Sequence, residues 1–344
     1  MIDIKSIYYP ELEKLIVDNG FPKFRAKQIW GWLNKGAESF AEMKNLPKNI
    51  IDFLRESSYI SVANIEKKLV SRYDKTVKYL FMLGDGEFVE TVVMNYHHGY
   101  SICVSTQVGC KMGCTFCATG KSGFSRSLTA SEILAQIESA QKDLNVRISN
   151  IVLMGMGEPL DNFDNVIRFL KLVSNEDGLN IGMRHITLST CGIVPRIYEL
   201  AEYNFGLTLS VSLHAPDNET RSKTMPINNR YPIEQLIKAC RDYFDKTGRR
   251  VSFEYAMIDG VNDSDLNAEK LGTLLKGLNC HVNLIPVNSV KGSEYKKSRV
   301  DRQQAFVNIL KKYSITATVR RTLGSDINAS CGQLKRNHTE KGGK

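Results

Sequence analysis

Hydrophobic and polar residues follow the period of amphipathic helices through the start of the chain. Helical spacing extends over residues 11–19, 24–33 and 47–56. Gly20 follows the first of these segments and Pro22 stands at a first-turn position before the second, where such residues commonly end and begin helices. The pattern predicts a small helical domain over residues 1–60.

Strand-forming sequence comes next. Residues 77–83 and 88–96 are rich in β-branched and aromatic side chains, and Gly84-Asp85-Gly86 between them is typical of a hairpin turn. We therefore expect a β-hairpin within a connecting region over residues 61–98.

From residue 99 onward, short apolar segments alternate with amphipathic ones in six β/α units. The predicted strands are residues 102–106, 150–154, 185–190, 207–213, 251–257 and 281–286, and the predicted helices lie near 130–142, 163–174, 195–203, 233–246, 268–275 and 302–313. Strands that alternate with helices favour a parallel sheet. A closed eight-unit barrel needs two more units than the sequence holds, so we expect an open, partial β/α barrel of six units over residues 99–330. Residues 316–321 are a candidate further strand.

The composition is that of an ordinary globular protein, with 42% hydrophobic and 24% charged residues. No window approaches the roughly 18 uninterrupted apolar residues of a membrane span. The first residues do not combine a basic segment with an apolar one, so no signal peptide is supported and we expect a cytoplasmic protein. The eight cysteines are therefore expected to be reduced thiols and metal ligands.

The charge balance favours a polyanionic partner. Lys and Arg number 46 against 37 Asp and Glu, which gives a net charge of +9. A solvated helix face explains such charges as well as RNA does, so charge alone leaves nucleic-acid binding open. Many of the basic residues gather near the end of the chain: Lys296, Lys297, Arg299, Lys311, Lys312, Arg320, Arg321, Lys335, Arg336 and Lys341.

The most informative chemical feature is a cysteine triplet, Cys110, Cys114 and Cys117, in a glycine-containing loop. Such a loop can hold an iron–sulfur cluster, which normally takes four cysteine ligands, so one iron would stay open, as in catalytic metal sites. A structural zinc site that borrows a distant His or Cys is the alternative. A disulfide is disfavoured because three is an odd number and nothing indicates secretion.

Further candidate residues follow the predicted strands, as the cysteine loop follows the first. In a β/α barrel the carboxyl ends of the strands share one face, which forms the active site. We therefore expect these residues to line one site, although a glycine turn and a single histidine also have purely structural interpretations. They are Gly157 and Glu158 after the second strand, Ser189 at the end of the third, Ser212, Leu213 and His214 at the fourth, and Asn288 after the sixth.

The triplet followed by Ala-Thr-Gly is similar to the signature of the radical S-adenosylmethionine (SAM) enzymes, and its surroundings resemble the RlmN type, which methylates C2 of adenine in RNA. The resemblance extends from about residue 10 to residue 335. The substrates that it implies are adenosine 2503 of 23S ribosomal RNA and adenosine 37 of some transfer RNAs. It rests on six blocks in order: FVETV from Phe88, GMGEPL from Gly155, LST from Leu188, SLHA from Ser212, LIPVN from Leu284 and ASCGQL from Ala329.

This resemblance implies cofactors and roles. Cys110, Cys114 and Cys117 would hold one 4Fe-4S cluster, whose open iron binds the amino and carboxylate groups of SAM. One electron from a flavodoxin-type donor would then cleave SAM to a 5′-deoxyadenosyl radical, while the protein positions and shelters the reaction. Contacts to SAM would come from Gly157, Glu158, Ser189, Ser212, Leu213, His214 and Asn288.

A methyl carrier is implied as well. Cys331, in a tail over residues 331–344, would accept a methyl group from one SAM, and the radical from a second SAM would activate that methyl for addition to adenine, so two SAM are used per turnover. Glu90 would remove the C2 proton, and Cys103 would free Cys331 by forming a disulfide. Each also has an ordinary interpretation: Glu90 as an outward carboxylate, Cys103 as a small buried side chain, and Cys331 as incidental. The remaining cysteines match no functional position: Cys191, Cys240 and Cys280.

Two alternatives stay open. A sister group of enzymes methylates C8 of the same ribosomal adenine and confers antibiotic resistance. This chain carries Pro159 and Pro286 in the pattern of the C2 enzymes. A non-catalytic, zinc-dependent RNA-binding module would need a fourth metal ligand and no cofactor pocket.

Overall fold

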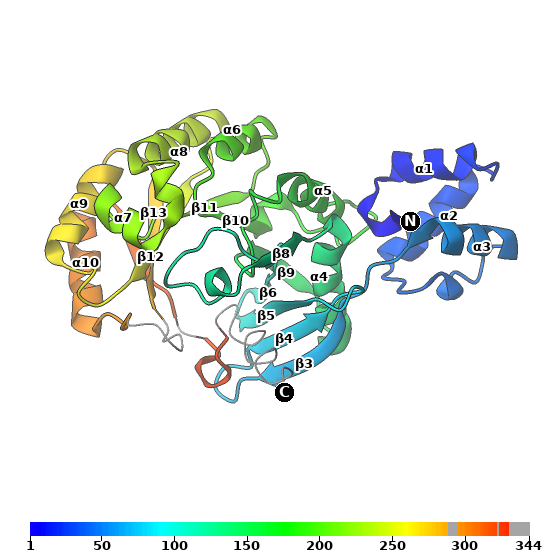
Figure 1. Cartoon of the computed structure of the whole chain (residues 1–344), viewed down its shortest axis with the longest axis horizontal. Coiled ribbons are helices and arrows are strands. Elements are labelled where there is room, and N and C mark those ends of the chain that lie inside the picture. The colour runs from blue at the N-terminus through cyan, green and yellow to red at the C-terminus, as the bar shows by residue number, and fades with distance from the viewer. Residues whose placement is uncertain (288–294, 322, 330–344) are drawn as a thin grey trace.

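The computed structural model describes residues 1–287, 295–321 and 323–329. A ten-stranded mixed sheet dominates these residues, in the order β14-β13-β12-β11-β10-β9-β6-β5-β4-β3. Because β14 and β3 are its two edges, the sheet does not close into a full barrel (Figure 1). No helix among the described residues is long and apolar enough to cross a membrane.

The seven strands from β6 to β14 along this sheet pair in parallel. Helices cover the outer side of this curved part (Figure 1). The partial barrel is therefore confirmed. The strands are β6 (Gly99–Cys103), β9 (Ile148–Leu153), β10 (Ile186–Thr190), β11 (Thr208–Ser212), β12 (Val251–Met257), β13 (Cys280–Pro286) and β14 (Thr316–Val319), and the helices are α4 (Ala130–Leu144), α5 (Phe163–Val173), α6 (Val194–Glu202), α8 (Ile233–Thr247), α9 (Asp265–Leu275) and α10 (Val300–Lys312).

Successive side chains in these strands point alternately to the hydrophobic core under the helices and to the interior of the barrel. In β12, Val251, Phe253 and Tyr255 are fully buried in the main hydrophobic core. Glu254 and Ala256 point to the other side, where they line a cavity. Apolar side chains thus fix each strand against the helices and leave its alternate positions free for chemistry.

The predicted hairpin, β4 (Val77–Met82) and β5 (Phe88–Tyr96), extends this sheet: β5 pairs with β6 and continues it in antiparallel fashion. A further strand, β3 (Asn64–Val70), was not predicted. Its residues are mostly exposed, and the polar sequence Asn-Ile-Glu-Lys-Lys is typical of a solvated sheet edge, where alternation of apolar residues is weak.

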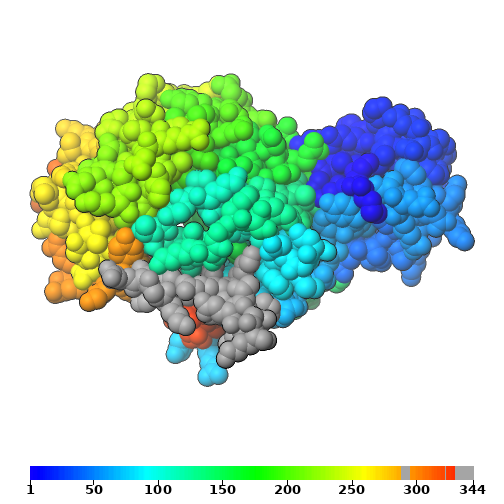
Figure 2. Space-filling model, in the orientation of Figure 1, coloured from blue at the N-terminus to red at the C-terminus, as the bar shows by residue number. Residues whose placement is uncertain are grey.

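Three helices form the N-terminal domain: α1 (Tyr9–Asp18), α2 (Phe24–Asn34) and α3 (Lys48–Ser57). Figure 2 shows this domain as a lobe at one end of the molecule. It is attached to the barrel through the side chain of Trp30, which donates a hydrogen bond to Asp177 (3.1 Å), and through Lys5, whose ammonium lies 2.6 Å from Glu138. A short parallel pair, β1 (Ile2–Asp3) and β2 (Ser58–Tyr59), joins its two ends.

Several short elements escaped prediction, and three of them flank the site. They are β7 (Gln107–Gly109) and β8 (Phe124–Ser127), which pair on either side of the cysteine loop, and α7 (Asn218–Thr224) after β11. Elements of three to seven residues are too short for a hydrophobic period to be recognised.

Candidate active site

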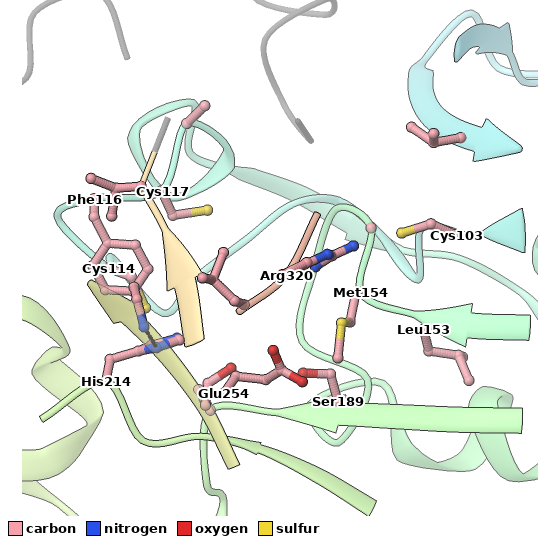
Figure 3. A pocket seen from close by; sticks show the side chains of 18 of the residues that line it. Cys103, Cys114, Phe116, Cys117, Leu153, Met154, Ser189, His214, Glu254 and Arg320 are labelled. Atoms are coloured by element: carbon pink, nitrogen blue, oxygen red, sulfur yellow. Dashed lines mark hydrogen bonds between the residues drawn. The ribbon is translucent and has the colours of Figure 1, made fainter. Parts of the chain in front are cut away.

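The carboxyl ends of the parallel strands surround a cavity of about 370 Å³. Figure 3 shows Cys114 and Cys117 on one side of it and Cys103 on the other. Leu213 is fully buried and does not line the cavity, whereas Asn288 and Cys331 lie outside the described residues. The predicted site residues that line the cavity are Cys103, Cys110, Cys114, Cys117, Gly157, Glu158, Ser189, Ser212 and His214.

The cysteine loop is closed at its base by the β7–β8 pair. The N–H of Cys110 donates to the carbonyl of Gly123 at 2.8 Å. Gly109 must be a glycine, because its φ is +82° and a Cβ there would lie 2.0 Å from that same carbonyl oxygen. The far side of the loop is held by Thr115, whose N–H donates to the carbonyl of Thr224 at 3.0 Å. The cysteine loop is thus anchored at one end to the β7–β8 pair and at the other to the end of α7.

The environment of the cysteines disfavours free thiolates. Burial raises the pKa of Cys110 to about 12 and, with the neighbouring thiols and Glu158, also raises the pKa of Cys114. Metal binding requires deprotonated thiols, so a positively charged metal centre would have to stabilise them there. The raised pKa values therefore argue against reactive free thiolates at Cys110 and Cys114.

Two glycines bring the turn after β9 against the chain that follows β6. A Cβ on Gly155 would lie 2.4 Å from the carbonyl oxygen of Val104, and one on Gly157, whose φ is +104°, would lie 2.6 Å from Cβ of Gln107. Met156 between them accepts a hydrogen bond through its carbonyl from the N–H of Thr106 (2.8 Å). Only glycine permits so close an approach, which presents the turn to the cavity.

Glu158 follows this turn and is almost fully buried. One carboxylate oxygen accepts the N–H of Cys191 at 2.7 Å, and the other accepts the N–H of Leu160 at 3.0 Å. Burial raises the pKa of Glu158, although these hydrogen bonds act in the opposite direction. The side chain thereby links the ends of β9 and β10 at the edge of the cavity.

His214 acts as a neutral side chain. Its Nδ1 accepts the N–H of Ala256 at 2.9 Å, and burial together with the charge of Arg221 lowers its pKa to about 3. Its ring meets that of Phe116, in the cysteine loop, edge to face with centroids 4.9 Å apart. His214 therefore connects the loop to β12, and the proton of a neutral ring bonded in this way belongs on Nε2.

The side of the cavity formed by β5 and β6 is apolar and is covered by the C-terminal segment. Val92 and Cys103 are register partners in neighbouring strands, and they form a buried cluster with Met94. Leu323 and Ala329 pack against this cluster. Ala329 is the last described residue of the chain, and Cys331 comes two residues after it in the sequence.

Glu90 lies on the same face of β5 as Val92 but does not line the cavity. Its side chain is completely buried, and Lys78 on β4 places its ammonium 2.9 Å from a carboxylate oxygen of Glu90. The ordinary interpretation of Glu90 as an outward, solvent-exposed carboxylate is therefore wrong.

Comparison with known proteins agrees with this arrangement. The chain matches family models described as the Radical SAM superfamily (residues 104–270) and the ribosomal RNA large subunit methyltransferase N-terminal domain (residues 2–60). It is 55% identical over 339 residues to a probable dual-specificity RNA methyltransferase RlmN of Alkaliphilus oremlandii, with 98% of this chain and 99% of that protein covered. The chain belongs to the RlmN family of radical SAM methyltransferases. The resemblance found in its motifs is thereby confirmed.

Further relatives extend the match. An RlmN protein of Clostridium tetani, also named a probable dual-specificity RNA methyltransferase, is 53% identical over 344 residues, with 100% of this chain and 99% of that protein covered. The crystal structure of a radical SAM methyltransferase from Sphaerobacter thermophilus is 44% identical, with a TM-score of 0.92 and coverage of 97% of this chain and 99% of that one. The RlmN fold therefore applies to nearly the whole chain.

Membership of the radical SAM superfamily implies a 4Fe-4S cluster and SAM. The donor set at the cavity fits them, with three thiols from one loop beside a carboxylate and hydroxyl groups. Among the described residues, no three Cys, His, Asp or Glu side chains are grouped so as to hold a single metal ion.

The structure adds Arg221 to the residues that shape the RlmN cavity. This side chain is fully buried, and its guanidinium donates to the carbonyls of Cys191 (2.6 Å) and Ser212 (3.2 Å). It thus joins the ends of β10 and β11 beneath the cavity. In the sequence Arg221 lies among polar residues of a short helix, and nothing there distinguishes it from a surface arginine. Other cavity residues that the sequence did not indicate are Phe116, Met154, Glu254 and Leu323.

Replacing Gly155 should damage the cavity. In Gly155→Ala the new Cβ meets two backbone atoms, Val104 O at 2.4 Å and Ser105 N at 2.6 Å. We therefore expect about 1–3 kcal/mol of destabilisation and at least about tenfold weaker SAM binding. Urea unfolding and SAM titration measure the two effects. Gly84→Ala is the matched control, because a Cβ there meets nothing within 4 Å. Equal SAM affinity in the two variants would contradict the prediction.

Proposed function

We propose that this chain methylates C2 of adenine in RNA, at adenosine 2503 of 23S ribosomal RNA and adenosine 37 of transfer RNAs. The observation that carries the proposal is one cavity in which the cysteine loop and the Gly157-Glu158 turn meet Cys103 and Ala329. Ala329 stands two residues before Cys331 in the chain. Most of the proposed cofactor-binding residues and Cys103 thus lie around one space, which the described chain reaches again at Ala329.

The cofactors would be one 4Fe-4S cluster and two SAM per turnover. When bound, they supply the methyl group and the radical chemistry that activates it, with an electron from a flavodoxin-type donor. Cys110, Cys114 and Cys117 would hold the cluster through their thiolates. The contacts to SAM would come from Gly157, Glu158, Ser189, Ser212, Leu213, His214 and Asn288.

Among the SAM contacts, Glu158 suits an ammonium group. It is a buried carboxylate already fixed by two backbone N–H groups, so it is held in one orientation. Neutral His214 and the hydroxyls of Ser189 and Ser212 can exchange hydrogen bonds with a polar ligand without adding charge.

Cys331 would carry the methyl group to adenine. Its thiolate would attack the methyl carbon of the first SAM, with S-adenosylhomocysteine as the leaving group. The radical from the second SAM would remove one hydrogen atom from that methyl, the resulting carbon radical would bond to C2 and link protein and RNA covalently, and the adduct would give one electron back to the cluster. Glu90 would take the C2 proton, and the thiolate of Cys103 would attack the sulfur of Cys331 to form a Cys103–Cys331 disulfide, while the carbon keeps the electron pair of the broken carbon–sulfur bond and takes up a proton to become the methyl group. The packing of Ala329 on the Cys103 cluster supports this pairing.

RNA from cells with and without this protein tests the proposal by nucleoside mass spectrometry. We expect 2-methyladenosine to disappear from 23S ribosomal RNA and from transfer RNA when the protein is absent. Pro159 and Pro286, both at the cavity, favour C2 over C8. Loss of 8-methyladenosine instead would identify the C8 reaction. The zinc-dependent module is set aside because the chain belongs to the RlmN family.

RNA affinity should depend on the arginines at the mouth of the cavity. Arg320 and Arg321 line the cavity and are exposed, so they can reach phosphates. We expect Arg320→Ala with Arg321→Ala to reduce the slope of log affinity against log salt by about 1–2. Arg196→Ala, on the outer helix α6, is the control and should keep the slope of the unmodified protein. A slope unchanged in the double variant would place the phosphate contacts elsewhere.

A further inference from the structure

Lys78 joins two parts of the proposed reaction centre. Its side chain is 1% exposed, and its ammonium lies 2.9 Å from a carboxylate oxygen of Glu90 and 2.8 Å from the carbonyl oxygen of Asn328. The first contact reaches the neighbouring strand, and the second reaches a segment 250 positions later in the chain. We propose that Lys78 is a positioning residue that holds the carboxylate of Glu90 through an ion pair and holds the C-terminal segment beside the cavity; this rests on the proposed function.

The ion pair with Lys78 fixes the side chain of Glu90. Glu90 is completely buried, and burying a charge costs free energy unless that charge is paired. The ammonium of Lys78 supplies the opposite charge 2.9 Å from a carboxylate oxygen of Glu90, and this contact holds the carboxylate in one position on β5.

The turn between β3 and β4 also binds the C-terminal segment through backbone hydrogen bonds. Asp74 accepts the N–H of Gly324 at 2.8 Å, and Asp326 accepts the N–H of Arg72 at 2.9 Å. Lys78 adds the last of these contacts along the described chain, at Asn328.

This anchor is close in sequence to the proposed methyl carrier, because Cys331 follows Asn328 by three residues. Ala329, next to Asn328, packs on the Cys103 cluster, so the anchor holds the described end of the segment against the proposed partner of Cys331. Lys78 alone among these anchoring residues also pairs with Glu90, so its loss affects both the base and the carrier.

The test compares Lys78→Met with Lys78→Arg, which keeps the charge and the donors. With SAM and RNA supplied, we expect Lys78→Met to load iron and cleave SAM, yet to release 2-methyladenosine at least tenfold more slowly and to accumulate protein joined to RNA. Lys78→Arg should recover most of this release. Lys5→Met is the matched control, because Lys5 forms a similarly buried pair with Glu138 at 2.6 Å in the N-terminal part of the chain. If Lys78→Met released 2-methyladenosine at the rate of the unmodified protein, or if Lys78→Arg released it no faster than Lys78→Met, the proposed role of Lys78 in positioning Glu90 would be overturned.

A second measurement needs no turnover. In the protein with its cluster but without SAM or RNA, hydrogen exchange at residues 324–329 should be at least tenfold faster in Lys78→Met than in Lys5→Met. If Lys78→Met does not fold, the double variant Lys78→Met with Glu90→Gln removes both charges and is compared with Glu90→Gln alone. If hydrogen exchange at residues 324–329 were equally fast in the two variants that are compared, the proposed role of Lys78 in anchoring this segment would be overturned. Failure of the unmodified protein to form 2-methyladenosine would instead overturn the proposed function and leave the exchange result standing.

Discussion

Cys114→Ala is expected to lose iron and SAM cleavage together. The unmodified protein, reconstituted without oxygen, should be brown and bind about four irons per chain, because three thiolates of one loop can hold a 4Fe-4S cluster. Removing one of the three thiolates leaves two ligands, which do not hold the cluster in place. Iron and sulfide analysis, visible absorbance and the yield of 5′-deoxyadenosine measure the loss.

Cys240→Ala is the matched control for this loss. Cys240 is also a buried cysteine, but it lies in α8 within the main core and away from the cavity. This variant should keep its iron and its SAM cleavage and lose about 1 kcal/mol of stability at most. Stoichiometric zinc without visible absorbance in the unmodified protein would contradict the cluster assignment.

The barrel could be predicted from sequence because its strands are buried on both faces and alternate with amphipathic helices. β12, for example, has the predicted bounds, Val251–Met257. The edge strand β3 lacks this signal, since one side of it faces solvent and its residues are mostly polar. The hydrophobic pattern thus predicts buried strands well and strands at the edge of a sheet poorly.

The sequence also predicted that most of the candidate site residues lie close together. Because parallel strands end at one face, the motifs after β6, β9, β10 and β11 had to meet, and they line one cavity. The partners of buried charges could not be predicted in this way. Lys78 and Arg221 look like surface residues in the sequence, since their partners, Asn328 and Cys191, are distant along the chain. Lys78 and Glu90 did leave one signal, opposite charges inside two otherwise apolar strands.

Cys331→Ala and Cys103→Ala should fail at opposite ends of the reaction. Without Cys331 no methyl group is carried, so Cys331→Ala should neither gain the mass of a methyl group nor join to RNA, and 2-methyladenosine should fall to background. Without Cys103 the adduct forms but is not released, so Cys103→Ala should complete less than one turnover and be isolated joined to RNA through Cys331. Nuclease digestion followed by mass spectrometry of the tryptic peptide distinguishes the two outcomes.

Glu90→Gln completes this set of variants. It keeps the shape of the side chain and a hydrogen-bond acceptor for Lys78 but removes the base, so the C2 proton stays and the adduct should be trapped as in Cys103→Ala. Cys280→Ala is the control, because Cys280 is a buried cysteine of β13 that does not line the cavity, and it should turn over normally. Normal turnover of Cys103→Ala, or 2-methyladenosine formed by Cys331→Ala, would rule out a two-cysteine mechanism in this chain. Trapping in Cys103→Ala without trapping in Glu90→Gln would keep the carrier cysteine and assign the proton to a different base.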